Sequence, residues 1–95
     1  MPFRLTATTR FLSQAEHLPH DVYRQLQKQI LLLEQNPRHP SLQTHEVRNA
    51  VGSHGGKIFE GYVNKQYRFT WEYGKERSEI ILRNVDNHDE CLKNP

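Results

Sequence analysis

Hydrophobic and polar side chains alternate strictly over residues 67–73 of this sequence. The odd positions are all aromatic and the even positions are polar or charged: Tyr67, Phe69, Trp71 and Tyr73 against Arg68, Thr70 and Glu72. A period of two is typical of a β-strand with one face buried and the other in solvent. Four rings on one face favour the core of a sheet over the alternative of a stacking platform for bases. The working surface would then be the face that carries Arg68.

Two further stretches are predicted to be strands on either side of this one. Residues 57–63 are rich in β-branched and aromatic side chains, and residues 64–66 make a short turn into the alternating segment. Residues 74–77 make a loop, and residues 78–85 follow with the apolar run Ile80, Ile81 and Leu82. The pattern predicts an antiparallel meander.

The first half of the chain has helical spacing. After a candidate strand at residues 2–6, Thr8 or Thr9 is suited to cap a helix that ends near residues 17–19. A second, amphipathic helix is predicted from about residue 20 to residue 34, and Pro37 follows its end. Residues 44–47 are expected to form a short extended piece, and the glycine-rich residues 50–56 a mobile loop. This order predicts an α+β domain in which a helical hairpin packs on a twisted, mostly antiparallel four-stranded sheet.

The composition narrows the class of protein. A chain of 95 residues has room for one domain, residues 1–95. The single cysteine, Cys91, excludes an internal disulfide and fits a reducing compartment. No apolar run approaches the length of a membrane span. We therefore expect a cytoplasmic protein that makes no contact with a membrane.

The charge is distributed unevenly along the chain. The formal net charge is only +2, but Lys and Arg outnumber Asp and Glu over residues 36–75, and the reverse holds over residues 76–95. Four of the six histidines lie in or beside the basic part and the last strand: His39, His45, His54 and His88. A basic face that bears histidines suits an anionic partner such as RNA. Ordinary scatter of charge would explain the same distribution.

Several segments together resemble a known family. They are the two-helix start, the loop at residues 36–42 (NPRHPSL), the step from residues 62–63 to residues 67–69, and the strand that closes in residues 84–89. In this order they are similar to the RelE/ParE superfamily of bacterial toxin–antitoxin toxins, over nearly the whole chain. The resemblance implies a RelE-like fold and a cognate antitoxin as partner. It implies a monomer or weak homodimer when the chain is free.

The resemblance implies one of several activities. The RelE-like branch consists of endoribonucleases that cut messenger RNA in the ribosome, which would make the ribosome and mRNA partners of this chain. The ParE-like branch inhibits gyrase and has no nuclease chemistry, and some related domains only bind other proteins. RelE-like cleavage needs no cofactor, because the RNA 2′-hydroxyl attacks the adjacent phosphate while protein groups move protons and stabilise charge. DNA lacks this hydroxyl and would be spared.

Two residues match the catalytic positions of the RelE-like branch. His88 lies just past the last strand, where many of these nucleases carry a catalytic histidine, and an imidazole can act as acid or base near neutral pH. Arg68 matches the family's strand arginine, and its planar fork suits a phosphate. Each also has a structural explanation: His88 as a polar residue in a turn, and Arg68 as a partner of Glu60 or Glu72. A tyrosine that some relatives carry beside the histidine is absent here.

The remaining candidates follow from the same comparison. Glu46 and Lys57 are the other candidate catalytic residues; Glu46 and His45 lie where some relatives place a base. The candidate RNA or phosphate contacts are Arg83, Lys65, His54, His45 and Arg48. Glu60 is unexpected next to an anionic ligand, unless it acts as the base or pairs with Arg68. The histidines and Cys91 do not have the spacing of a metal site, so we expect no metal.

Overall fold

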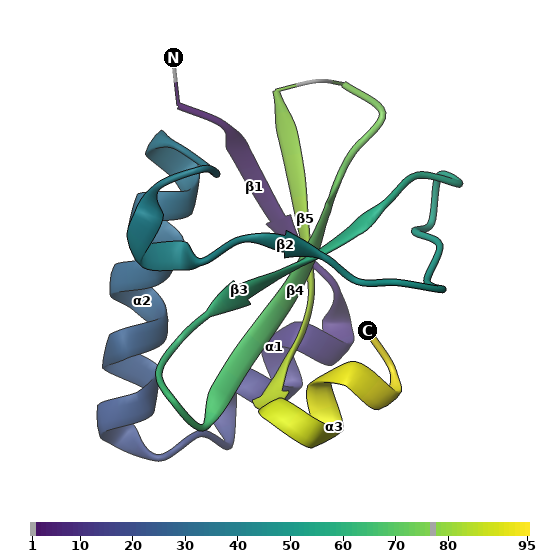
Figure 1. Cartoon of the computed structure of the whole chain (residues 1–95). Helices are drawn as coiled ribbons and strands as arrows, with labels where there is room; N and C mark the ends of the chain where they lie inside the picture. Colours follow the sequence, from purple (N-terminus) through teal and green to yellow (C-terminus); the bar gives the residue numbers. More distant parts are fainter. Residues whose placement is uncertain (1, 77) are drawn as a thin grey trace.

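The protein is an α+β domain built around one five-stranded sheet. A computed structural model describes residues 2–76 and 78–95, and Figure 1 shows the arrangement. The elements are β1 (Arg4–Ala7), α1 (Thr9–Glu16), α2 (His20–Gln35), the 3-10 turn η1 (Pro40–Leu42), β2 (His45–Glu46), β3 (Ile58–Tyr62), β4 (Tyr67–Tyr73), β5 (Glu79–Asn87) and α3 (His88–Lys93). The strand order is β1-β5-β4-β3-β2, with β1 parallel to β5 and the other pairs antiparallel.

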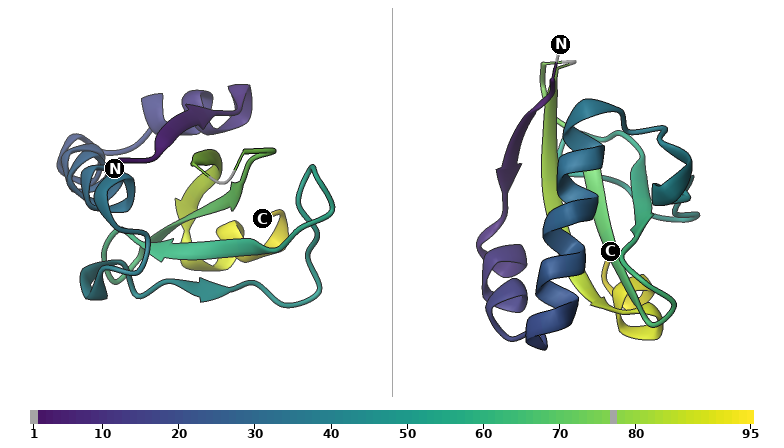
Figure 2. Two further views of the ribbon diagram at one scale, coloured as in Figure 1. Left: turned by 90° about the horizontal axis from the view of Figure 1, so that it is seen from above. Right: turned by 90° about the vertical axis from the view of Figure 1, so that its left-hand side faces the viewer.

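The alternation in β4 divides the sheet into an apolar and a polar face, as the sequence predicts, but the expectation that the polar face lies in solvent is wrong, because Thr70 and Glu72 are buried. Phe69 and Trp71 are buried on one face, opposite Val85 and Leu82 of β5. Their rings belong to the same core as the apolar sides of α1 and α2, and Figure 2 shows these two helices together on one side of the sheet. Phe69 and Trp71 therefore belong to the core and Tyr67 packs against it, whereas Tyr73, predicted to share this core, is exposed.

Local contacts fix the two long helices. The Thr8 hydroxyl caps α1 by accepting a hydrogen bond from the backbone N–H of Phe11 (3.1 Å), so the predicted cap is confirmed. In α2 the buried Gln29 amide donates to the carbonyl oxygens of Ser41 (3.0 Å) and Tyr62 (2.6 Å). One side chain thus joins α2 to η1 and to the end of β3.

The structure adds two short elements to the predicted set. The extended piece at residues 44–47 pairs with β3 as β2, so the sheet has five strands and the predicted count of four is wrong. No element is predicted after the last strand, but residues 88–93 form α3; the Asn87 side chain caps it by accepting from the backbone N–H of Glu90 (3.0 Å). Both elements lie at the polar face of the sheet and help to build the site.

A β-bulge changes which residues of β5 reach that face. Asn84 pairs with Thr70 and Leu82 pairs with Trp71, so Arg83 has no partner residue in the ladder. The Arg83 side chain accordingly contacts Glu72 on the polar face. In the described part of the chain no helix is long and apolar enough to span a bilayer.

Candidate functional site

A buried carboxylate lies at the centre of the polar face. Strand register sets Glu60 of β3 between Thr70 of β4 and His45 of β2. The Glu60 side chain is fully buried, and neither carboxylate oxygen has a hydrogen-bond partner of good geometry among the described residues. An isolated buried carboxylate is costly, so its neighbours must supply compensating charge.

Three nitrogen-bearing side chains surround the Oε1 atom of Glu60. The Nε2 atom of His45 lies 3.1 Å from it, the Nε atom of Arg68 lies 3.8 Å from it, and the Nδ1 atom of His88 lies 4.0 Å from it. The side chains of the two histidines are about half exposed, at 58% and 46%, whereas that of Arg68 is 18% exposed. We call these four residues the Glu60 cluster. It presents two accessible imidazoles and one guanidinium around a single buried negative charge.

Arg68 is held in place by the hairpin between β3 and β4. Its Nη1 atom donates to the carbonyl oxygens of Asn64 and Tyr67, the second at 3.0 Å. Its guanidinium carbon lies 4.7 Å from the centre of the Tyr62 ring, a cation–π arrangement. None of the hydrogen bonds of the described residues uses Nη2, so this atom keeps donors for a ligand. A fork fixed on one side and open on the other suits a phosphate oxygen.

His88 is positioned by the start of α3. It is the first residue of that helix, and its backbone N–H donates to the carbonyl oxygen of Gln66 (2.7 Å), which ties α3 to the β3–β4 hairpin. Because Nδ1 lies on the side of Glu60, the Nε2 atom is left for a ligand. An imidazole in this position can exchange a proton with a substrate.

His45 has acceptors at both ring nitrogens. Its Nδ1 atom lies 3.1 Å from the carbonyl oxygen of Gln43, and its Nε2 atom lies 3.1 Å from Glu60. A doubly protonated ring donates to both oxygens, whereas a neutral ring donates to only one. The two oxygens therefore fix the plane of the His45 ring. The sequence names His45 as a candidate contact and as lying where some relatives place a base, and the structure adds its direct link to Glu60.

Further along the same face, Arg83 forms a second charged group with Glu72. The Arg83 Nη1 atom donates to a Glu72 carboxylate oxygen and to the Ser53 hydroxyl (2.9 Å), and its Nε atom donates to the carbonyl oxygen of Pro95 (3.1 Å). Burial alone would raise the pKa of Glu72, but the hydrogen bond from the Ser53 backbone and the hydrogen bond and charge of Arg83 together lower it. Arg83 therefore joins parts of the structure through these contacts and also contributes positive charge to the surface.

Cys91 is buried under α3 beside this face. The Cys91 thiol lies 3.5 Å from the carbonyl oxygen of Arg68, and the Asn84 amide donates to the backbone carbonyl oxygen of Cys91 (3.1 Å). Burial, followed by the negative charges of Glu60 and Asp86, raises the pKa of Cys91 to about 12. The residue is therefore a neutral thiol at physiological pH and is unsuited to act as a nucleophile.

The structure separates the other candidates from the sequence. Lys65 is exposed in the β3–β4 hairpin, next to the Asn64 carbonyl that holds Arg68. Glu46 and Lys57 form an exposed ion pair (3.5 Å), and the register of Glu46 with Phe59 puts it on the face opposite Glu60. The structure does not bring this pair to the Glu60 cluster. His54 is exposed in the loop before β3, and Arg48 follows β2 toward the far end of the face.

Solved structures with this architecture are numerous. The RelE–RelB complex of Pyrococcus horikoshii matches with a TM-score of 0.71 at 15% identity, over 92% of this chain and 96% of that one. The toxin–antitoxin complex RelBE2 of Mycobacterium tuberculosis matches at 0.69 and 17%, over 93% and 100%. The chain has the RelE fold. The intact RelBE complex of Escherichia coli is similar at 0.65 and 18%, over 87% and 93%. No family model and no curated protein sequence matches the chain.

Within this RelE fold, the pairing of Glu60 with Arg68 that the sequence offered as one alternative is present (3.8 Å), but the contacts of Glu60 with His45 and His88 were not predicted. Burial does not alternate along residues 58–62. Ile58 and Glu60 are buried, and so is Gly61 between them and Tyr62, because the Phe69 ring covers it. The signal for Glu60 that the sequence does contain is an acidic residue at a position where an anionic ligand is expected. Among residues 2–76 and 78–95, no group of three or more acidic, histidine or cysteine side chains is placed to hold a metal ion.

Proposed function

We propose that this chain is the toxin of a toxin–antitoxin pair and cuts messenger RNA through attack of the RNA 2′-hydroxyl on the neighbouring phosphate. The observation that carries the proposal is the Glu60 cluster: a buried carboxylate that gathers His45, Arg68 and His88 on one sheet face. The fold supports it, because solved structures of the same architecture are toxins in complex with their antitoxins. No metal takes part in the proposed reaction.

The reaction requires a base, an acid and a cation. The base removes the proton of the 2′-hydroxyl as the new 2′-oxygen–phosphorus bond forms, and the acid protonates the 5′-oxygen as its bond to phosphorus breaks. The products are a 2′,3′-cyclic phosphate and a 5′-hydroxyl. We assign the base to Nε2 of His88, stabilisation of the phosphorane charge to Arg68, and the acid to His45, whose exposed Nδ1–H would have to leave the Gln43 carbonyl oxygen to reach the 5′-oxygen. Glu60 is a positioning residue, because it is fully buried and acts through the other three.

The exposure of the cluster supports the proposed partners. His45 and His88 lie on an open face rather than in a closed cleft, so the protein itself offers few walls to orient a message. We propose that the ribosome supplies that orientation, and positioning is a large part of catalysis. We also propose that the cognate antitoxin covers this face with an acidic or amphipathic segment that orders on binding. An elution volume unchanged by the product of the neighbouring gene would count against this partner.

The direct test is to map RNA ends in a translating ribosome mixture. Wild-type protein should produce cuts with 5′-hydroxyl and 2′,3′-cyclic phosphate ends, and the cuts should be at least tenfold fewer with His88→Ala and with Glu60→Gln. His20→Ala is the matched control, because His20 is an exposed histidine at the start of α2 on the other side of the sheet. A parallel reaction without ribosomes shows whether they are needed. Intact RNA in every lane would overturn the proposal.

A ParE-like gyrase inhibitor is the main alternative, and a RelE-fold protein that only binds partners is another. Neither role has a chemical use for two half-exposed imidazoles that share one buried carboxylate. Loss of supercoiling by purified gyrase in the presence of this protein, with RNA left intact, would favour the first alternative. If gyrase keeps its supercoiling activity and the RNA also stays intact, the second alternative is favoured.

A further inference from the structure

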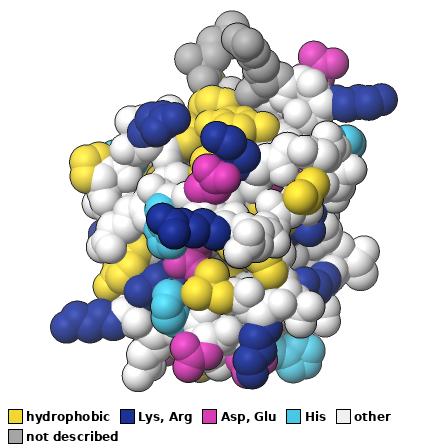
Figure 3. Space-filling view, turned by 45° about the vertical axis from the view of Figure 1, so that its right-hand side comes forward, with side chains coloured by type: hydrophobic (Ala, Val, Ile, Leu, Met, Phe, Trp, Pro, Cys, Tyr) yellow, Lys and Arg dark blue, Asp and Glu magenta, His cyan; other side chains and the backbone are white. Residues whose placement is uncertain are grey.

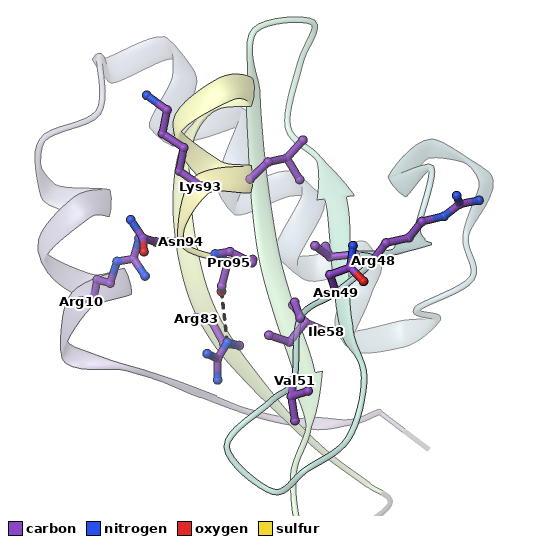
Figure 4. Close-up of a pocket in the computed structure, with 12 residues that line it drawn as sticks. Arg10, Arg48, Asn49, Val51, Ile58, Arg83, Lys93, Asn94 and Pro95 are labelled. Carbon is purple, nitrogen blue, oxygen red and sulfur yellow. Dashed lines mark hydrogen bonds between the residues drawn. The ribbon is translucent and has the colours of Figure 1, made fainter.

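A hollow lies on the same sheet face as the Glu60 cluster, at the other end of α3. It has a volume of about 530 Å³, and Figure 4 shows it between α1, the segment after β2 and the last residues of the chain. Its basic lining residues are Arg10, Arg48, Arg83 and Lys93, and Asn49 and Asn94 add side-chain amides; no acidic residue lines it. We call this hollow the basic pocket.

Two of its four cations have no acidic partner in the described part of the chain. Lys93 pairs with Glu90 (3.0 Å) and Arg83 pairs with Glu72, but no ion pair of the described residues involves Arg10 or Arg48. Figure 4 shows these two arginines on opposite sides of Arg83 and Pro95. Uncompensated guanidinium groups on either side of a polar hollow make a site for an anion.

The basic pocket and the Glu60 cluster share their supporting segments. His45 belongs to the cluster, and Arg48 lines the pocket three residues later. His88 begins α3 at the cluster, and Pro95 reaches the pocket, where its carbonyl oxygen accepts from the Thr70 hydroxyl (2.9 Å). On β4, Arg68 belongs to the cluster, and Glu72 pairs with Arg83 of the pocket. At the rise of a strand, the distance along β4 from Arg68 to Glu72 is about 13 Å. A single nucleic-acid strand can therefore contact both.

We propose that the basic pocket binds the phosphodiester backbone of single-stranded RNA, a short distance along the strand from the phosphate that is cut. The inference rests on the proposed function for the position of the cut and extends it with a second phosphate site. Apolar side chains at the rim favour a nucleotide over a bare phosphate ion, because Val51 and Leu92 are 69% and 41% exposed and can contact the faces of bases. On the face shown in Figure 3, basic and acidic side chains are interspersed. The four cations of the basic pocket therefore do not simply reflect a uniformly basic surface.

The test is a binding titration with a fluorescent oligouridine whose 2′-hydroxyls are methylated, so that it cannot be cut. Arg10→Gln and Arg48→Gln should each weaken binding roughly threefold to tenfold and lower the salt slope by about 0.7. Arg24→Gln, an exposed arginine on α2, is the matched control and should bind like wild type. A methylated uridine dinucleotide is too short to contact both regions, so it should bind more weakly than the longer strand and lose little in either variant.

The outcomes separate this inference from the proposed function. Dependence of binding on Arg10 and Arg48 without any cleavage of unmodified RNA would support the pocket and overturn the nuclease. Cleavage by wild type, together with unchanged oligouridine binding in both variants, would overturn the pocket alone. Oligoglutamate is the competing ligand. If it binds in an Arg10- and Arg48-dependent way and oligouridine does not, the site takes an acidic peptide and the RNA assignment is wrong.

Discussion

At the scale of single residues, the main feature of this protein is a carboxylate in an unfavourable place. Glu60 is completely buried, yet its oxygens have no hydrogen-bond partner of good geometry among the described residues. Its neighbours lie at 3.1 to 4.0 Å and supply charge rather than ideal hydrogen bonds. Polar groups held in this way are typical of functional sites, where activity opposes maximal stability.

Glu60→Gln tests that opposition. We expect the nuclease rate to fall at least tenfold and the pH–rate profile to change shape, because the neutral amide no longer orients and compensates the two imidazoles. The melting temperature at neutral pH should not fall, since an amide is easier to bury than a carboxylate and Arg68 keeps its contacts with Asn64, Tyr67 and Tyr62. RNA-end mapping over a pH series and thermal unfolding measure the two effects. A lower melting temperature with an unaltered pH profile would show that Glu60 is only structural.

His88→Ala should act on the rate alone. Removing a positioned acid or base lowers a rate by roughly 10²- to 10⁴-fold. Stability should change little, because the side chain is about half exposed and its helix is fixed through backbone groups. Initial cleavage rates beside thermal unfolding curves provide the measurement, with His20→Ala as the control. Equal rates for the two variants would remove His88 from the mechanism.

At the scale of elements, the strongest periodic patterns could be predicted, whereas the pairing of the short piece at residues 44–47 into the sheet and the helix α3 could not. The alternation in β4 and the apolar stripe of α2 each extend over enough residues to reveal their period. β2 has two residues and exists only because it pairs with β3. α3 has six residues, so its main signal was the local one at Asn87, followed by Asp89 and Glu90 in the first turn and Lys93 in the last.

The same contrast explains the site. Arg68 and His88 are candidates from the sequence because each matches a position in a family pattern, and the structure places both beside Glu60. The link from Glu60 to His45 depends on a strand pairing between residues far apart in the chain, which no local pattern contains. Adjacent residues of β2 also point to opposite faces, so His45 and not Glu46 lies beside Glu60.

Asn87 connects the stability of α3 to the position of His88. Its side chain caps the helix on which His88 is the first residue. Asn87→Ala should cost about 1 kcal/mol of folding free energy and also lower the nuclease rate, because the helix start loosens. Asn87→Ser keeps a capping oxygen and should restore most of both. Chemical denaturation and cleavage rates are the readouts; a rate that Asn87→Ala leaves unchanged would mean that the Gln66 contact alone holds His88.

At the scale of the whole molecule, the sheet separates two different interiors. Phe11, Leu26 and Phe69 represent the apolar core between the sheet and the two long helices. The other face is held by polar contacts, and Glu72 with Arg83 joins β4, β5, the loop at Ser53 and the last residue, Pro95. Gly52 is needed in this arrangement, because a Cβ atom there would lie 2.5 Å from Glu72. The pair of Glu72 and Arg83 therefore supports the surface on which the Glu60 cluster and the basic pocket, the two proposed RNA contacts, lie.

The pH dependence of unfolding tests this support. Because the pKa of Glu72 is lowered in the folded protein, its contribution to stability is complete above its unfolded value of 4.5 and is lost as the pH falls through the lower folded value. Glu72→Gln should therefore lower the free energy of unfolding by about 2 kcal/mol at neutral pH, since it leaves Arg83 without its anionic partner. Wild type and variant should converge in acid, where the wild-type carboxyl is also neutral. Urea denaturation from pH 7 to pH 3 measures the difference, with Glu16→Gln on the exposed surface of α1 as the control. A difference that is constant across this range would show that Glu72 contributes by shape and not by charge.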